Sequence, residues 1–345
     1  FFKYDDYGIT KLGYFDLSGK FKFLVSELGG LSQGRPYSGG SFSISRNDRY
    51  AFTFGNVYNP SDLAVGIRGS KLRLTSLNEN LFELKNLGEV KEIKYRSSYD
   101  NLEIQGWIVT PPNFDPKKKY PLILEIHGGP FSNYGFRFST EVQLYASKGY
   151  VVLYVNPRGS TSYGKKFANE IHHNYPNHDY DDLISGVNYL LDKGFIDKKN
   201  LFVTGGSGGG VLSSWIVGKT DIFSAAVVAK PVINWYSFVL YADNTSLYYK
   251  YWFKNFPWND LEDYMKRSPI SYVGNIKTPT MLLTGEKDYR TPISESEQFY
   301  TALKLNRVET MLVRIPNSSH SIASKPSNLI AKVNSVLYWF DKFRR

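Results

Sequence analysis

The chain has 345 residues, which is enough for one large domain and a smaller one. Its 42% hydrophobic and 21% charged residues are typical of a folded globular protein and exclude a disordered one. The net charge of +10 comes from lysines and arginines scattered along the chain, so we expect no nucleic-acid site, which requires them to be clustered. The absence of cysteine excludes disulfides, thiolate metal sites and a cysteine nucleophile.

The apolar runs and the first residues of the chain indicate whether it crosses a membrane or carries a targeting segment. The longest apolar runs are far shorter than the roughly 20 residues of a membrane helix, so we expect no membrane span. The sequence opens FFKYDD, with neither an initiator methionine nor the basic-then-apolar pattern of a signal peptide. We interpret it as a processed or truncated piece of a soluble protein, whose compartment, cytoplasmic or exported, stays undetermined.

Residues 1–87 predict antiparallel β structure. Short alternating stretches such as YFDLSGKFKFLV and SFSISRNDRYAFTFG are separated by turn signals at Ser18-Gly19 and Asn47-Asp48. Their spacing is similar to that of β-propeller blades, although roughly two blades are too few to close a ring.

Residues 88–345 predict an α/β fold. Short continuous apolar runs alternate with helical patterns such as DDLISGVNYLLDKG, and the last segment is a strongly amphipathic helix. Strands that are buried on both faces give such runs, so we expect a mostly parallel sheet with helices on both faces. The predicted strands include residues 122–126, 151–155, 201–204, 225–229, 280–284 and 310–315.

The stretch VTGGSGGG joins the strand 201–204 to a predicted helix, which excludes a flexible linker. A phosphate-binding loop is disfavoured because no Lys-Ser or Lys-Thr follows the glycines at the right distance. Gly205, Ser207 and Gly209 instead fit the G-x-S-x-G turn that presents a nucleophilic serine between a strand and a helix. Glycines at these two positions would relieve the crowding of the tight turn.

Ser207 has suitable partners later in the chain. In this kind of fold the order is serine, acid, histidine, and among five histidines only His320 follows Ser207. Asp288 follows a predicted strand, and Glu286 in the same loop is the alternative acid. We therefore predict Ser207 as the nucleophile, His320 as the general base, and Asp288 as the residue that orients the imidazole.

An oxyanion hole requires backbone N–H groups opposite the serine. The strand 122–126 runs into HGGP, and we assign the N–H groups of Gly129 and Gly208 to this role. His127 is predicted to be structural. The other histidines, His172, His173 and His178, lack the spacing of a zinc site, so we expect neither a metal nor a cofactor.

The motifs HGGP, NPRGSTSYG, GGSGGG and GEKDYRTP, followed by the His320 loop, resemble the prolyl oligopeptidase family of serine peptidases. The closest branch is the acylaminoacyl-peptidase and dipeptidyl-aminopeptidase-like one. The resemblance covers about residues 88–345 and implies an α/β-hydrolase catalytic domain there, with 1–87 as the last one or two blades of a partial propeller. It also implies the same triad and oxyanion residues, although many relatives have a larger residue where this chain has Gly208.

The resemblance also suggests substrate-binding residues. Arg290 matches an arginine that holds a substrate carbonyl in relatives, with a surface arginine that only supports the site as the alternative. The aromatic segment 233–258 matches the region that forms the pocket for the residue before the cut bond. Trp235, Phe238 and Tyr241 are the candidates to line it, with ordinary core packing as the alternative.

We therefore expect a serine peptidase that cleaves short peptides through an acyl-enzyme, of oligopeptidase, acylaminoacyl-peptidase or dipeptidyl-aminopeptidase type. A carboxylesterase-like hydrolase on the same scaffold is the alternative, and a non-catalytic binding protein is a further one. Because an open propeller exposes strand edges, we also expect self-association or pairing with the missing part of the propeller.

Overall fold

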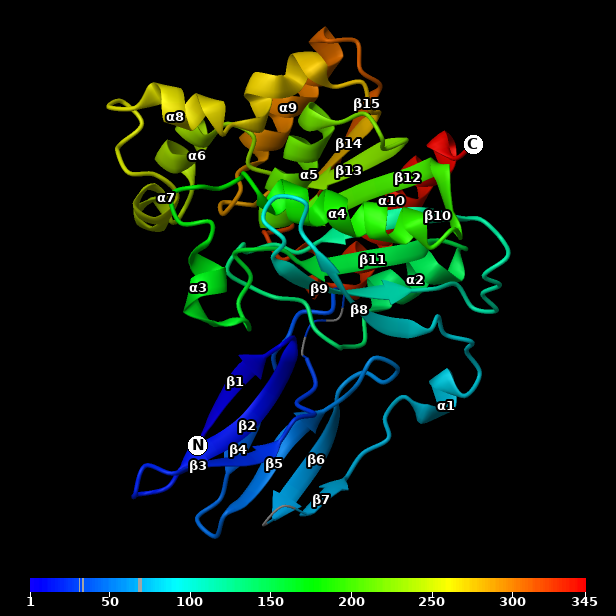
Figure 1. The fold of residues 1–345 in the computed structure, drawn as a ribbon, viewed down its shortest axis with the longest axis vertical. Helices are drawn as coiled ribbons and strands as arrows, with labels where there is room; N and C mark the ends of the chain where they lie inside the picture. Colours follow the sequence, from blue (N-terminus) through cyan, green and yellow to red (C-terminus); the bar gives the residue numbers. More distant parts are fainter. Residues whose placement is uncertain (31, 33, 68–69) are drawn as a thin grey trace.

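The computed structural model describes residues 1–30, 32, 34–67 and 70–345. Figure 1 shows an α/β part with a central sheet, and below it two smaller antiparallel sheets that contain the N-terminus. The fold class predicted from the sequence, an α/β hydrolase preceded by antiparallel β structure, is confirmed. The division at residue 87 and the assignment of the smaller sheets to a propeller remain predictions.

The central sheet has eight strands in the order β15-β14-β13-β12-β10-β11-β9-β8. Strands β10 to β15 run parallel to one another, whereas β9 is antiparallel to both β11 and β8. All six apolar runs predicted as strands are strands. The bounds are β8 (Val90–Arg96), β9 (Glu103–Val109), β10 (Tyr120–Ile126), β11 (Val151–Asn156), β12 (Ile196–Gly206), β13 (Ala225–Ala229), β14 (Thr280–Gly285) and β15 (Thr310–Ile315).

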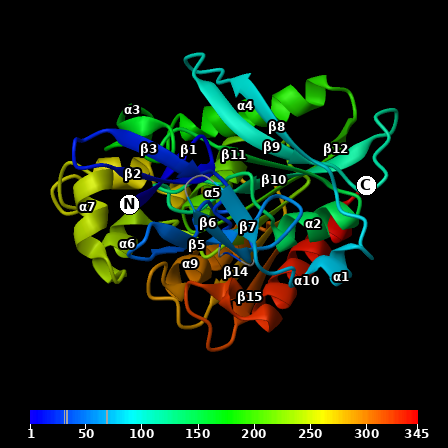
Figure 2. The same cartoon turned by 90° about the horizontal axis from the view of Figure 1, so that it is seen from below.

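Two apolar cores, one on each face of the central sheet, explain these continuous apolar runs. Along β10, Leu122 and Leu124 pack into the core under α4, α5 and α9, while Ile123 packs into the core under α2 and α10. Figure 2 shows α4 on one side of the sheet and α2 and α10 on the other. The helices of this part are α2 (Thr140–Ser147), α3 (Gly164–Asn169), α4 (Asp179–Asp192), α5 (Gly208–Lys219), α6 (Trp235–Tyr241), α7 (Thr245–Trp252), α8 (Leu261–Lys266), α9 (Ile293–Leu305) and α10 (Pro326–Phe343).

The N-terminal region forms two antiparallel sheets around a small core of its own. As predicted, turns at Gly19 and Asp48 join neighbouring strands, and both residues have a positive φ. The first sheet contains β1 (Phe2–Asp6), β2 (Ile9–Phe15) and β3 (Phe21–Val25). The second contains β4 (Phe42–Ile44), β5 (Arg49–Phe54), β6 (Asp62–Ile67) and β7 (Ser70–Arg73), and the short helix α1 (Glu79–Phe82) leads to β8.

The segment between these two sheets reaches into the α/β part. The Arg35 guanidinium lies 2.7 Å from a carboxylate oxygen of the buried Glu125 on β10. The Tyr37 hydroxyl accepts a hydrogen bond of 2.7 Å from the N–H of Gly128, directly after β10. The N-terminal region therefore contacts the edge of the sheet at which the candidate site lies.

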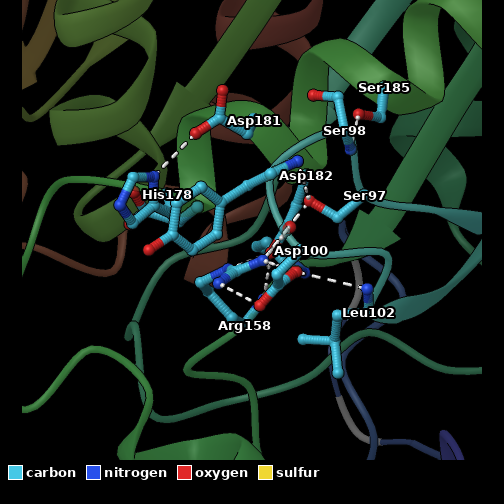
Figure 3. A network of polar contacts seen from close by, with 12 residues as sticks. Ser97, Ser98, Asp100, Leu102, Arg158, His178, Asp181, Asp182 and Ser185 are labelled. Atoms are coloured by element: carbon cyan, nitrogen blue, oxygen red, sulfur yellow. Dashed lines mark hydrogen bonds and ion pairs between the residues drawn. The ribbon is translucent and has the colours of Figure 1, made fainter.

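A buried ion pair fixes the loop that follows β11. Arg158 donates to both carboxylate oxygens of Asp182 on α4, at 2.8 and 3.0 Å, and to Asp100 in the turn between β8 and β9 (Figure 3). The same loop carries Ser160, whose hydroxyl lies 2.9 Å from Nε2 of His127. The ion pair thereby positions the contact that supports the HGGP turn.

We predict that Asp182→Asn lowers the free energy of unfolding by about 3 kcal/mol, because it leaves the buried guanidinium of Arg158 without its full counter-charge. Asp181→Asn, one residue earlier, is the matched control. Asp181 pairs with His178 at the surface and should change stability by less than about 1 kcal/mol. Urea denaturation of the three proteins measures the difference, and equal losses in both variants would contradict the role of the buried pair.

Candidate active site

Ser207 lies at the sharp turn between β12 and α5. Its backbone adopts φ 61° and ψ −121°, a left-handed conformation that costs energy for a residue with a side chain. A Cβ on Gly205 would lie 2.3 Å from the carbonyl oxygen of Gly209, and one on Gly209 would lie 2.1 Å from that of Ile126. Only glycine fits these two positions, as the sequence pattern predicted.

Three side chains from separate loops form a continuous hydrogen-bond chain. His320 Nε2 lies 3.0 Å from Ser207 Oγ, and His320 Nδ1 lies 2.8 Å from Asp288 Oδ2. The buried Asp288 carboxylate also accepts hydrogen bonds from the Thr291 N–H and hydroxyl. Glu286, the alternative acid, is partly exposed and lies 3.6 Å from Arg314, so its carboxylate faces a different partner.

Burial and neighbouring charges set the protonation of this chain. Burial alone would raise the pKa of Asp288, but the hydrogen bond and charge of His320 outweigh it and hold that pKa below its usual value. Burial lowers the pKa of His320, and the nearby Lys230 ammonium lowers it further, while Asp288 opposes both. The imidazole is therefore neutral at neutral pH and free to accept a proton at Nε2.

The HGGP turn packs against the first turn of α5. A Cβ on Gly208 would lie 3.1 Å from the backbone nitrogen of Gly129, closer than an ordinary contact. A side chain after the serine would therefore require the HGGP turn to move by a few tenths of an ångström. The Gly128 N–H is bound by Tyr37, whereas the N–H groups of Gly129 and Gly208 have no acceptor within the described residues.

His127, the first residue of the HGGP turn, is held by polar contacts of its ring. It is buried, and burial lowers its pKa to about 4, so the ring is neutral. Its two ring nitrogens lie within 2.9 Å of Ser160 Oγ and the Gly128 carbonyl oxygen. These contacts agree with the structural role predicted for it.

A small cavity of about 30 Å³ opens beside Ser207, with mostly apolar walls. Of the three residues that the resemblance suggested, Trp235 and Phe238 line this cavity, whereas Tyr241 does not and is 69% exposed. Tyr175, which no sequence motif marks, lies outside the aromatic segment and donates to the Gly208 carbonyl at 2.9 Å. The remaining walls include Pro130, Val211, Val232, Tyr248, Trp252 and Thr291.

Arg290 lies two residues after Asp288, but its guanidinium faces another acid. Its N–H donates to Asp288 at 3.0 Å, while its guanidinium Nε donates to Asp243 at 2.6 Å. The side chain is 46% exposed. Its backbone thus helps to hold Asp288, and its guanidinium lies at the surface beside the site.

Neither a metal cluster nor a membrane helix is found in the part of the chain that the structure describes. No three His, Asp or Glu side chains come together there as ligands for an ion. His172 and His173 stack on each other at 3.8 Å between ring centroids. None of the helices combines the length and the apolar character needed to cross a bilayer.

The fold is that of an α/β hydrolase, with a serine at the turn where such enzymes hold their nucleophile. The model of the prolyl oligopeptidase family matches residues 136–344, and the chain belongs to that family of serine peptidases. It is 37% identical over 307 residues to the uncharacterized peptidase YuxL of Bacillus subtilis, covering 88% of this chain and 47% of that protein.

Further relatives agree with this assignment. A probable dipeptidyl-peptidase 5 of Aspergillus clavatus is 31% identical, over 85% of this chain and 40% of that protein. The acylaminoacyl peptidase of Pyrococcus horikoshii superimposes with a TM-score of 0.88 at 26% identity, over 99% of this chain and 54% of that one. The chain spans about half the length of these relatives.

The depressed pKa of His320 predicts where activity is lost on acidification. The base must be neutral, so kcat/KM should fall as the pH drops through the His320 pKa, with a midpoint below the ordinary histidine value of about 6.5. The pH profile of peptide hydrolysis measures this midpoint, after preincubation controls for stability. A midpoint above 6.5 would contradict the role that we assign to burial and Lys230.

Proposed function

We propose that this chain hydrolyses short peptides through an acyl-enzyme on Ser207, with His320 as the base and Asp288 as its partner. The unbroken hydrogen-bond chain from Asp288 through His320 to Ser207 carries this proposal. All three residues are those that the sequence order suggests, and their loops lie at the carboxyl ends of parallel strands.

The reaction follows from the geometry. His320 Nε2 takes the hydroxyl proton as Ser207 Oγ bonds to the substrate carbonyl carbon. The N–H groups of Gly129 and Gly208 stabilise the oxyanion that forms. The C–N bond then breaks as His320 returns the proton to the leaving amine. Water then attacks the ester carbonyl and gives a proton to His320. As the acyl C–O bond breaks, His320 returns that proton to Ser207 Oγ, which releases the acid and the free serine.

Asp288 contributes by fixing the imidazole. Its carboxylate accepts a hydrogen bond from Nδ1–H, which leaves the lone pair of Nε2 directed at the serine. The negative charge also stabilises the imidazolium that exists between the two proton transfers. Hydrogen bonds from Thr291 hold this carboxylate in place, so the base keeps one tautomer and one orientation.

The apolar cavity supports a preference on the acyl side of the cut bond. Trp235, Phe238 and Trp252 would surround the side chain of the residue before that bond, which favours an apolar one. We propose that Arg290 holds a carbonyl of the preceding residue, since only its Nε is used by Asp243. Substrates of dipeptidyl, acylaminoacyl or short oligopeptide type agree with the names of the relatives.

The N-terminal sheets have exposed apolar side chains against which further antiparallel strands could pack. Phe15 and Phe23 are more than half exposed on strands β2 and β3. Apolar surface of this kind is expected where another blade or a second copy packs. We therefore propose a larger propeller, or self-association, as the setting in which this catalytic part works.

We predict that Ser207→Ala lowers kcat for a peptide p-nitroanilide by about 10⁴- to 10⁶-fold, because the nucleophile is lost. Asp288→Asn should lower it by about 10⁴-fold through loss of the correct tautomer. The matched control is Glu286→Gln in the same loop, which should keep kcat within about twofold, since Glu286 does not contact His320.

Two results would contradict the proposal. One is peptide cleavage that survives in Ser207→Ala at more than a small fraction of the original rate. The other is turnover of a nitrophenyl ester by the unaltered chain without any detectable peptide cleavage, which would favour the carboxylesterase alternative.

A further inference from the structure

A second cavity, of about 480 Å³, lies behind the His320 loop and is distinct from the one beside Ser207. Its walls come from the N-terminal segment, α2, the end of β13, the loop 321–324 and α10. Ser32, Ser321 and Ser324 line it and are exposed, so solvent reaches its mouth. The mechanism above uses none of its charged side chains, which are Arg35, Glu141, Lys230 and Lys332.

Hydrogen-bond donors outnumber acceptors in this cavity. Lys230 Nζ donates to the His320 carbonyl at 2.6 Å, and Lys332 Nζ donates to Glu141 at 2.5 Å. An ammonium has three N–H donors, and no second acceptor for either lysine is found within the described residues. Arg35 Nη2 is buried and likewise lacks a partner there. The unmatched acceptors are one oxygen each of Glu141 and Glu125.

Positive charge is also in excess. Arg35, Lys230 and Lys332 face the carboxylates of Glu125 and Glu141, which leaves one cation without a counter-charge, and the more distant Asp288 offsets it in part. Burial, followed by repulsion from Arg35 and Lys332, lowers the pKa of Lys230 to about 7. A buried cluster of this kind is stabilised by an added anion.

Lys230 connects this cavity to the reacting groups. Its ammonium holds the carbonyl of His320, and its own carbonyl accepts from the N–H of Ser207 at 3.2 Å. Tyr37, on another wall, holds the N–H of Gly128. A ligand that keeps the ammonium charged would therefore stabilise the loop that carries the general base.

We propose that this cavity binds a small oxyanion, a carboxylate or a tetrahedral anion, between Arg35, Lys230 and Lys332. The bound anion keeps Lys230 protonated and the His320 loop in place. The anionic group could come from two sources, a free anion in solution or the terminal carboxylate of a peptide bound to the enzyme. Arginine and lysine donors recognise both of them.

The test uses Ser207→Ala, so that binding is measured without turnover and independently of the proposed function. Sulfate is titrated calorimetrically at constant ionic strength against chloride, because its charge does not change near neutral pH. We expect one saturable site whose affinity falls as the pH rises through about 7, where Lys230 loses its proton. Lys230→Met in this background should weaken sulfate binding about tenfold or more.

Lys325→Met is the matched control, because Lys325 is an exposed lysine next to the same loop and outside the cavity. It should leave sulfate affinity unchanged. Should Lys230→Met fail to fold, the paired change Lys332→Met with Glu141→Gln removes a donor while conserving net charge, and should also weaken binding.

A second arm distinguishes the two sources. A short peptide with a free carboxyl end is compared with its C-terminal amide for binding to the same inactive protein. Tighter binding of the acid, lost in Lys230→Met, assigns the cavity to the peptide carboxylate, whereas sulfate binding without such a preference assigns it to a free anion. Absence of both effects, or equal losses in Lys230→Met and Lys325→Met, overturns the proposal.

Discussion

The proposed active site depends on a steric constraint at the end of β12. The chain must leave the strand, place Ser207 in a left-handed conformation and enter α5 within a few residues. This path passes so close to β10 that a single methyl group on Gly209 would overlap the carbonyl of Ile126. The strain is sustained because the central sheet and α5, both buried, fix the two ends of the turn.

Buried charges hold the loops that complete the site. Arg158 and Asp182 fix the loop behind His127, Arg35 and Glu125 attach the N-terminal segment to β10, and Lys230 ties the His320 loop to the end of β13. The paired ions among them would be costly to bury alone, so their pairing strongly favours these loop positions. The position of His320, the proposed base, therefore depends on these polar contacts as well as on apolar packing.

The sequence was sufficient to predict elements that are marked by a short run of residues or by their order in the chain. Continuous apolar runs predicted the parallel strands, and the order of Ser207, Asp288 and His320 predicted which loops meet, because parallel strands present their carboxyl ends at one edge. The sequence could not show which face of α6 points toward the cavity. The three aromatic residues were therefore predicted together, but Trp235 and Phe238 line the cavity while Tyr241, on the same helix, is exposed. The residues around Arg35 and Lys332 in the sequence do not mark either side chain as buried, since the partners of both are distant in the chain.

The covalent bond that an inhibitor forms shows directly which side chain is the nucleophile. The protein is treated with an aryl organophosphonate, digested and examined by peptide mass spectrometry, with Ser207→Ala as the control. We predict a single adduct on Ser207 that parallels loss of peptidase activity, and no adduct in His320→Ala, because the serine is activated only by that base. Inactivation with the adduct on another residue, or a folded protein whose Ser207 stays unmodified, would contradict the role of Ser207 as the nucleophile.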